Sequence, residues 1–240
     1  MHFRIKQLCV WAGQLWTPGA HARLLSAALL AALAAAACGG SASKQAQASP
    51  SPSPSPSVAS HPNWTSIDKQ AVGFTVQVPP HWDEASLSTI NKLLQNNPNV
   101  PSDMQTQLRT ALANDAIKLY VLDFDADASD QRFVTNFNVV EQSIPSGTTL
   151  QIYADANANQ LQHLNAFHPP LDQANVALPA GKAVRMHYSL DVSTLRADIT
   201  QFVFVHGTSA YVLTFTTLPD RLDKVRSTFQ SIAETFRFTS

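Results

Sequence analysis

The chain lacks the cysteines and the short motifs that would tie it to a known chemistry. Its 240 residues include two cysteines, Cys9 and Cys38. Cys9 falls in a segment that we expect to be removed, so the mature chain has no disulfide and must be stabilised by its apolar core. The sequence contains no G-x-S-x-G, H-E-x-x-H, C-x-x-C, phosphate-loop or dinucleotide-binding motif. We therefore predict that it is not an enzyme and has no cofactor; a hydrolase with a dispersed catalytic site stays open as an alternative.

A membrane-spanning run is missing as well. The most apolar stretch, Leu24–Ala37, has fourteen residues and no charge. At about 1.5 Å per residue a helix of this length spans roughly 21 Å, against about 30 Å for the hydrocarbon core of a bilayer. A permanent transmembrane helix is therefore not expected.

The chain has no basic run either. Of the 16 lysines and arginines, 12 follow His61, and so do all 17 aspartates and glutamates, which gives residues 62–240 a net charge of 12 − 17 = −5. Nucleic acid is therefore not an expected partner.

What is present at the start is an export signal. Basic residues (Arg4, Lys6 and Arg23) precede the apolar stretch, as in a secretory signal peptide. Ala35-Ala36-Ala37-Cys38 then resembles a bacterial lipobox, although Ala35 stands where that motif usually has leucine. We predict a signal peptide over 1–37, lipidation at Cys38 and anchoring to the extracytoplasmic face of the bacterial cell membrane. The alternative is cleavage at an Ala-x-Ala site, which would release a secreted protein with one free thiol.

A Ser/Pro-rich segment, 38–61, follows and includes a strict Ser-Pro alternation over Ser49–Ser57. Proline favours an extended polyproline-like chain, which at about 3.1 Å per residue would reach roughly 70 Å. We predict a disordered or semi-rigid tether that separates the membrane from the domain. A tail without a spacing role is the alternative.

The remaining 179 residues, 62–240, are long enough for one well-buried domain. Alternating apolar residues and turn signals predict seven strands. The last three of them form a meander that we expect at the centre of the sheet, and Ala166–Pro179 reads as a proline-rich surface loop. The predicted strands are Trp64–Asp68, Phe74–Val78, Ile117–Phe124, Phe133–Ile144, Lys182–Leu190, Asp198–His206 and Ala210–Thr217.

Apolar residues at helical spacing predict four helices. Leu87, Ile90 and Leu94 mark the first, and the Ser102/Gln105 capping box begins the second, which extends to Leu112. The third covers Thr149–Leu164, and the fourth begins near Pro219 and carries Leu222, Val225, Phe229, Ile232 and Phe236. The predicted fold class is α+β, a mostly antiparallel central sheet layered between helices.

Three groups of residues are candidate sites, each with a simpler interpretation. Asp123, Asp125, Asp127 and Asp130 alternate like the ligands of a calcium loop, but Ala128 and Val134 stand where that loop needs glycine and glutamate, so an exposed hairpin tip is favoured. His163 and His168 have no third metal ligand nearby, so we expect surface histidines. His187 and His206 lie on predicted strands, where an outward position is favoured over catalysis.

An opening motif and a closing strand and helix of the domain carry a resemblance to a known family. These motifs are Gly73-Phe74-x-Val76-x-Val78-Pro79-x-x-Trp82, Tyr211-x-Leu213-Thr214-Phe215 and Phe229-x-x-Ile232-x-x-Thr235-Phe236-x-Phe238. They are similar to the opening strand and to the closing strand and helix of PsbP-like domains. The resemblance covers roughly Asn63–Ser240 and implies an α/β/α sandwich that acts as a non-catalytic interaction scaffold; the signal and tether resemble the actinobacterial-type lipoprotein branch.

The function we predict is a lipid-anchored binding or assembly module for a protein partner. The first alternative is a cell-envelope accessory protein that binds a lipid or glycan in a groove near the Leu87–Leu112 helices. The second is the hydrolase, which would need a nucleophile, a base and oxyanion donors in one cleft.

Overall fold

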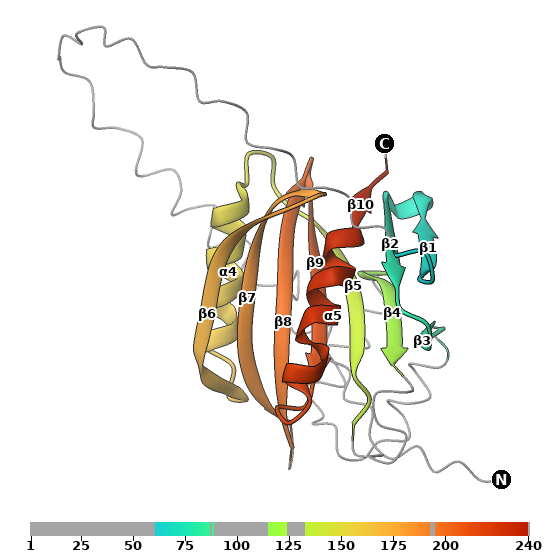
Figure 1. The fold of residues 1–240 in the computed structure, drawn as a ribbon. Helices are drawn as coiled ribbons and strands as arrows, with labels where there is room; N and C mark the ends of the chain where they lie inside the picture. The colour runs from blue at the N-terminus through green and yellow to red at the C-terminus, as the bar shows by residue number, and fades with distance from the viewer. Residues whose placement is uncertain (1–60, 87, 89–114, 124–132, 193–194, 240) are drawn as a thin grey trace, which may run out of the picture. The chain divides into compact units, whose positions relative to one another are not determined.

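The computed structural model of the chain describes residues 61–86, 88, 115–123, 133–192 and 195–239 (Figure 1). Several predictions fall outside these ranges: the signal peptide with Cys38, the tether before His61, and the two helices predicted between Leu87 and Leu112. Asp125, Asp127 and Asp130 of the acidic loop also lie outside them.

Seven antiparallel strands form the larger sheet, in the order β3-β4-β5-β9-β8-β7-β6. The meander β7-β8-β9 is confirmed, and β9 is the middle strand. The β8–β9 turn is tight, and Gly207 provides the positive φ of 60° that it requires. The strands are β3 (Trp82–Glu84), β4 (Ile117–Asp123), β5 (Asn136–Ser143), β6 (Phe167–Leu178), β7 (Gly181–Val192), β8 (Leu195–His206) and β9 (Ser209–Thr217).

The predicted loop Ala166–Pro179 is wrong, because most of it is the edge strand β6. Proline removes a hydrogen-bond donor and argues against a central strand, but an edge strand tolerates it. Pro169 and Pro170 lie where the β6–β7 register shifts, between His168 and Asp172, and the peptide bond between them is cis. Beyond the shift, β6 pairs regularly with β7 as far as Leu178 and Gly181.

Two helices cover opposite faces of this sheet among the residues described (Figure 1). Helix α4 (Leu150–Gln162) packs on side chains such as Met186 and Tyr188 of β7, and helix α5 (Leu222–Thr235) packs on Phe202 and Phe215 of β8 and β9. Alternation along each strand separates the two faces: Phe202 and Phe204 contact the α5 cluster, whereas Val203 belongs to the α4 cluster. The antiparallel α+β class is thus confirmed, with a helix on each face.

Local signals explain the bounds of both helices. The Thr149 hydroxyl accepts a hydrogen bond of 3.2 Å from the Ile152 amide and caps α4. Arg221 precedes α5, and its buried guanidinium donates to the Phe133 carbonyl at 2.9 Å, which ties the start of the helix to the chain before β5. None of the helices in the described ranges has the length and apolarity needed to cross a membrane.

A second, three-stranded sheet was not predicted as a separate unit. Its order is β1-β2-β10, with β1 (Thr65–Lys69), β2 (Phe74–Val78) and β10 (Arg237–Phe238), and the 3-10 turn η1 (Gln70–Val72) joins the first two. Gly73 follows that turn with φ 80°, a conformation that favours glycine. The two-residue strand β10 and the three-residue strand β3 are too short to carry a periodic signal in the sequence.

An aromatic cluster joins the small sheet to the large one. Phe236, which is fully buried at the end of α5, lies 5.2 Å from Phe74 of β2, 5.5 Å from Phe204 of β8 and 5.2 Å from Phe238 of β10, measured between ring centroids. Such pairs add about 0.5–1.5 kcal/mol each beyond their buried area. The aromatic residues of the closing motif are therefore core residues.

Candidate functional site

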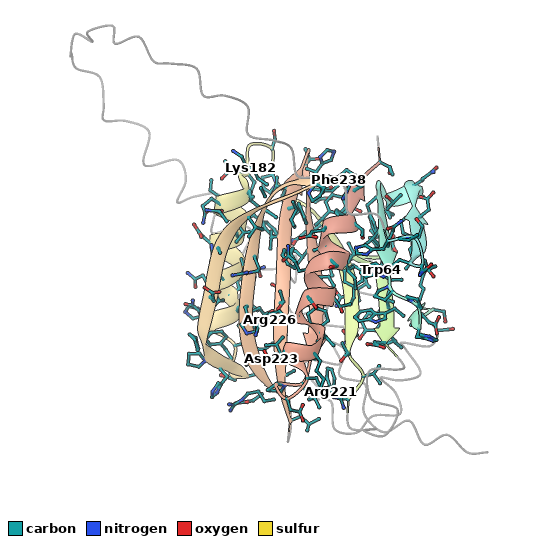
Figure 2. The ribbon with its side chains drawn as sticks, in the orientation of Figure 1. Trp64, Lys182, Arg221, Asp223, Arg226 and Phe238 are labelled. Atoms are coloured by element: carbon teal, nitrogen blue, oxygen red, sulfur yellow. The ribbon has the colours of Figure 1, made fainter. Side chains whose placement is uncertain are left out.

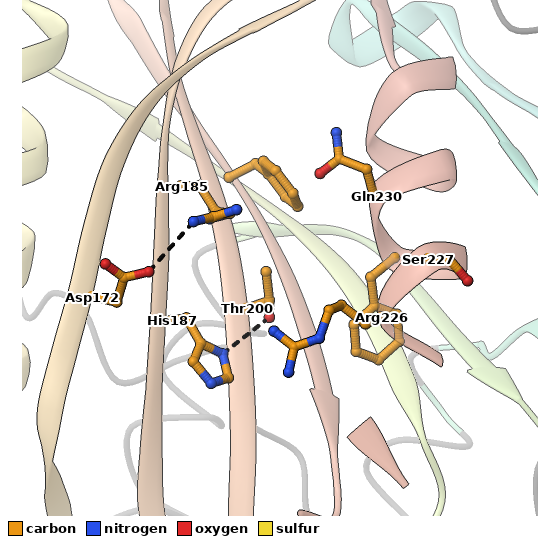
Figure 3. Close-up of a pocket in the computed structure, with 9 residues that line it drawn as sticks. Asp172, Arg185, His187, Thr200, Arg226, Ser227 and Gln230 are labelled. Atoms are coloured by element: carbon orange, nitrogen blue, oxygen red, sulfur yellow. Dashed lines mark hydrogen bonds and ion pairs between the residues drawn. The ribbon is translucent and has the colours of Figure 1, made fainter. Parts of the chain in front are cut away.

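A cavity of about 370 Å³ opens between α5 and strands β6, β7 and β8 (Figure 3). This is within the size range of small-molecule sites, about 300–1,000 Å³. Two nearly fully buried phenyl rings contribute to its wall, and polar side chains provide the rest. The lining residues are Asp172, Arg185, His187, Thr200, Phe202, Arg226, Ser227, Phe229 and Gln230.

Strand register brings the sheet residues of the pocket together. Asp172 of β6 lies opposite His187 of β7, which lies opposite Thr200 of β8. Arg185 lies opposite Phe202 in the next row on the same face. Because the neighbouring β7 residues pack toward α4, these side chains must point toward α5.

Helix α5 contributes the other side of the pocket. Arg226 and Gln230 are four residues apart, so they lie on one face of the helix. Figure 3 shows both side chains directed from α5 toward the sheet, where Arg185 and Thr200 face them. Figure 2 places Arg226 near the start of α5, close to Asp223 and to Arg221, which precedes the helix.

The two arginines of the pocket have weak partners. Arg185 Nη2 lies 3.3 Å from Asp172 Oδ2, and Arg226 Nη2 lies 3.4 Å from Asp223 Oδ1. Charge-assisted N–H···O bonds are usually about 2.7–2.9 Å, and exposed ion pairs contribute about 0–1 kcal/mol. Both guanidinium groups are therefore available to a stronger anionic partner at little cost.

The polar groups of this face do not form a catalytic triad. His187 Nδ1 lies 3.3 Å from Thr200 Oγ1, the sole hydrogen-bond partner recorded for this ring in the described ranges. The Ser189 hydroxyl donates to Asp198 instead of to a histidine. A serine nucleophile needs a base within hydrogen-bond reach, and within the described part of the chain this face pairs no serine with a histidine.

The same sheet face stays polar beyond the pocket. Arg196 Nε donates to Asp191 Oδ1 at 2.9 Å, and His168 Nδ1 lies 3.7 Å from Asp191 Oδ2. All three side chains are partly exposed. A polar strip thus continues from the pocket along β7 and β8.

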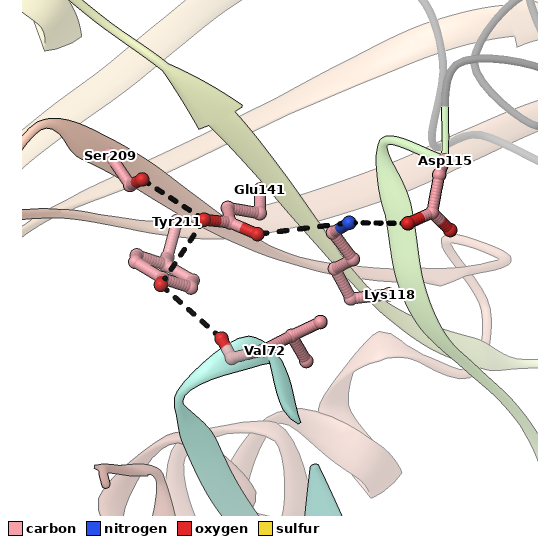
Figure 4. A network of polar contacts seen from close by, with 6 residues as sticks. All are labelled: Val72, Asp115, Lys118, Glu141, Ser209 and Tyr211. Carbon is pink, nitrogen blue, oxygen red and sulfur yellow. Dashed lines mark hydrogen bonds and ion pairs between the residues drawn. The ribbon is translucent and has the colours of Figure 1, made fainter. Parts of the chain in front are cut away.

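A second polar network lies where β5 and β9 meet the small sheet (Figure 4). The Glu141 carboxylate accepts from Ser209 at 3.0 Å and from Tyr211 at 3.4 Å, and Lys118 Nζ lies 3.8 Å away. The Tyr211 hydroxyl also lies 3.3 Å from the Val72 carbonyl of η1. Burial, followed by the Glu141 charge, raises the pKa of Tyr211. These contacts fix η1 against the large sheet, which indicates a structural role.

A buried polar row crosses the α4 face of the large sheet. Gln201 donates to Thr214 at 3.2 Å, and Asn157 of α4 donates to Gln201 at 3.4 Å. All three side chains are at most 3% exposed. They are enclosed, so we assign them to the internal packing of α4. The residues that lie opposite one another across the strands are Tyr120, Asn138, Thr214, Gln201, Met186 and Gln173.

The histidines and aspartates predicted from the sequence are separated. His163 contacts the Asn159 carbonyl within its own helix at 2.7 Å, whereas His168 pairs with Asp191. Asp123 ends β4, and the described ranges contain no group of three or more His, Cys, Asp or Glu side chains suited to a metal ion. His206 is exposed, as its outward position on a predicted strand suggested. Its ring stacks on that of Phe238, with 4.2 Å between the ring centroids.

The sequence favoured an outward position for His187, and the structure places its half-buried side chain on the sheet face opposite Met186 and Tyr188, where α5 packs. That face is the pocket, which sequence reasoning missed. Arg185 carried a usable signal, because it alternates with Val184 and Met186 and so shares the face of His187. No such signal marked Asp172, because this residue lay in the segment predicted as a loop.

Comparisons with known proteins give distant structural neighbours. No family model and no curated protein matches the chain. CyanoP, the PsbP of the cyanobacterium Synechocystis, is 14% identical over 75% of this chain and 94% of its own, with a TM-score of 0.47. LpqN, involved in cell envelope biogenesis of Mycobacterium tuberculosis, is 12% identical over 74% of this chain and 91% of its own, and its TM-score is also 0.47.

The Ran-binding protein Mog1p of Saccharomyces cerevisiae is 13% identical over 74% of this chain and 96% of its own, with a TM-score of 0.46. The neighbours thus include a PsbP protein, the family that the sequence resemblance indicates. Because these TM-scores are below 0.5, membership of that family stays a prediction from the sequence.

Proposed function

We propose that the chain is a lipid-anchored extracytoplasmic protein whose PsbP-like domain, 62–240, is a non-catalytic binding module for a protein partner. The location rests on the sequence: the basic and apolar leader, the lipobox-like residues that end at Cys38, and the Ser/Pro-rich tether. The domain would then stand away from the membrane, within reach of partners in the cell envelope.

The observation that carries the binding role is the partly covered α5 face of the large sheet. Helix α5 packs on β8 and β9, while β6 and β7 present polar side chains beside it. The resulting hollow has a buried phenyl floor and half-exposed or exposed charged groups at its rim. A concave site with an apolar floor and a polar rim is typical of recognition surfaces.

Site-specific photo-crosslinking in intact cells tests this role. A photo-reactive amino acid at Ser227, which is exposed on α5 and lines the pocket, should capture a discrete protein. Gln160, which is exposed on α4 on the other side of the sheet, is the matched control position. Mass spectrometry should identify the same adduct repeatedly at Ser227 and not at Gln160. Equal capture at both positions would contradict a binding surface on the α5 face.

The anchor is tested separately by metabolic labelling with palmitate. The wild-type chain should incorporate label, Cys38→Ala should lose it, and Cys9→Ala, which changes the other cysteine, should keep it. Label that persists in Cys38→Ala would remove the lipid anchor from this position.

A second candidate function is binding of a lipid or glycan, and the cavity itself favours it. The cavity lies beside α5. The groove expected from the sequence was near the helices predicted between Leu87 and Leu112, which lie outside the described residues. The lining of the cavity combines two phenyl rings with polar side chains, so it can cover an apolar face of a ligand and also pair with hydroxyl groups.

A further inference from the structure

The pocket beside α5 has an excess of positive charge in a protein domain that is acidic overall. Its lining includes two arginines and one aspartate, which gives 2 − 1 = +1 before any charge on His187 is counted. The domain, 62–240, has a net charge of −5. More of the lining residues are thus basic than acidic, whereas the domain is acidic; the Asp223 carboxylate that pairs with Arg226 lies outside the lining.

The two guanidinium groups approach the cavity from different elements. Arg185 lines the cavity from β7, where Figure 3 shows it paired with Asp172. Arg226 reaches the cavity from α5, and Figure 3 shows its guanidinium extending toward Thr200. Their side chains are 39% and 61% exposed, so a ligand can reach them. Each guanidinium has five N–H donors, and a carboxylate or phosphate can accept two of them in parallel.

Replacing the carboxylate partner of each arginine by a ligand anion is favourable. An exposed ion pair such as Arg185–Asp172, with 3.3 Å between Nη2 and Oδ2, stabilises little, whereas two parallel charge-assisted hydrogen bonds of ordinary length are stronger. A bidentate ligand would replace a single long contact at each arginine without leaving Asp172 or Asp223 buried, because both carboxylates are mostly exposed.

The neutral lining indicates what the anion is attached to. Thr200 offers a hydroxyl group and Gln230 offers an amide, and both groups can pair with ligand hydroxyls. The cavity volume of about 370 Å³ exceeds what a lone inorganic ion would fill.

We propose that this pocket binds a small, hydroxyl-rich organic anion, with Arg185 and Arg226 holding its carboxylate or phosphate. The inference goes beyond the protein-binding role and rests on the second candidate function, glycan binding, for which it names the chemistry of the ligand. The neutral donors then hold the hydroxylated body of the ligand over the phenyl floor.

Three sugars with the same ring test the proposal: glucose 6-phosphate, glucuronate and glucose. Calorimetric titration of the purified full-length chain should show saturable binding of glucose 6-phosphate, glucuronate or both, and no binding of glucose. Binding of glucose 6-phosphate alone would indicate a phosphate ligand, and binding of glucuronate alone would indicate a carboxylate ligand. Raising the salt concentration should weaken binding, because exposed charges are screened.

Variants locate the site. Arg185→Met and Arg226→Met should each weaken binding by about tenfold or more, as expected for loss of a charge-assisted contact. Arg196→Met is the matched control, because Arg196 also forms an exposed ion pair on this sheet face but does not line the pocket, and its affinity should be unchanged. If Arg185→Met fails to fold, Arg226→Met on the exposed surface of α5 carries the test.

Three results would overturn the proposal: no binding of either anion, equal binding of glucose, or equal losses in Arg196→Met and Arg226→Met. None of them would affect crosslinking of a protein at Ser227. Failure of this inference is therefore distinguishable from failure of the proposed function.

Discussion

Two buried tyrosines should make the domain unstable at alkaline pH. Tyr153 and Tyr188 are 4% and 3% exposed, and burial raises the pKa of each well above the ordinary value of about 10. Below about pH 10 each phenol is protonated in both the folded and the unfolded chain, so its full contribution to stability is present. As the pH rises further, only the unfolded chain ionises, and that contribution is progressively lost.

The magnitude follows from proton linkage. For a group with an unfolded pKa of about 10, the free energy of unfolding falls by about 1.4 kcal/mol between pH 9 and pH 11, so the two tyrosines together remove about 2.7 kcal/mol. This is a large part of the about 5–15 kcal/mol that stabilises an ordinary domain. Guanidinium unfolding followed by circular dichroism at several pH values measures the loss.

Tyr188→Phe isolates one of the two groups. The variant should lose about 1.4 kcal/mol less than the wild type between pH 9 and pH 11, because one titrating phenol has been removed. Lysine titration is common to both proteins and cancels in the difference. Equal pH dependence in the two proteins, or phenolate absorbance at 295 nm from all tyrosines while the native circular dichroism persists, would refute the reasoning.

Further substitutions test the packing and the helix cap. Phe229→Ala should lower the free energy of unfolding by about 3–5 kcal/mol, because the Phe229 ring is buried and stacks on Phe215 with 4.9 Å between ring centroids. Denaturant unfolding measures this loss. A loss below about 1 kcal/mol would mean that α5 is not packed as described. Thr149→Ala should cost about 1 kcal/mol in the same assay, because the Ile152 amide loses its cap, whereas Thr148→Ala should cost less because its hydroxyl does not cap α4. Equal effects of the two threonine variants would contradict the assigned cap.

Much of the fold followed from periodicity, and the exceptions have physical causes. The alternation that predicted the strand Asp198–His206 holds in β8, where Phe202 faces the α5 cluster and Val203 the α4 cluster. The failure at β6 came from treating Pro169 and Pro170 as loop signals, although their strand is at an edge, where missing donors are tolerated.

The pocket needed information that the sequence does not contain. Asp172, Arg185 and Arg226 lie on three elements, and only the strand register and the docking of α5 bring them together. The pairing of Asn157 in α4 could not be predicted from the sequence either. The pattern of α4 predicts which positions are buried, but it does not predict that a buried amide would pair with Gln201 of β8.

The most direct test of the account compares crosslinking yields at Ser227 and Gln160 in intact cells. These two exposed positions lie on helices that cover opposite faces of the large sheet. The account predicts a specific protein adduct at Ser227 in clear excess over Gln160. Equal yields at both positions, or an adduct confined to Gln160, would contradict it.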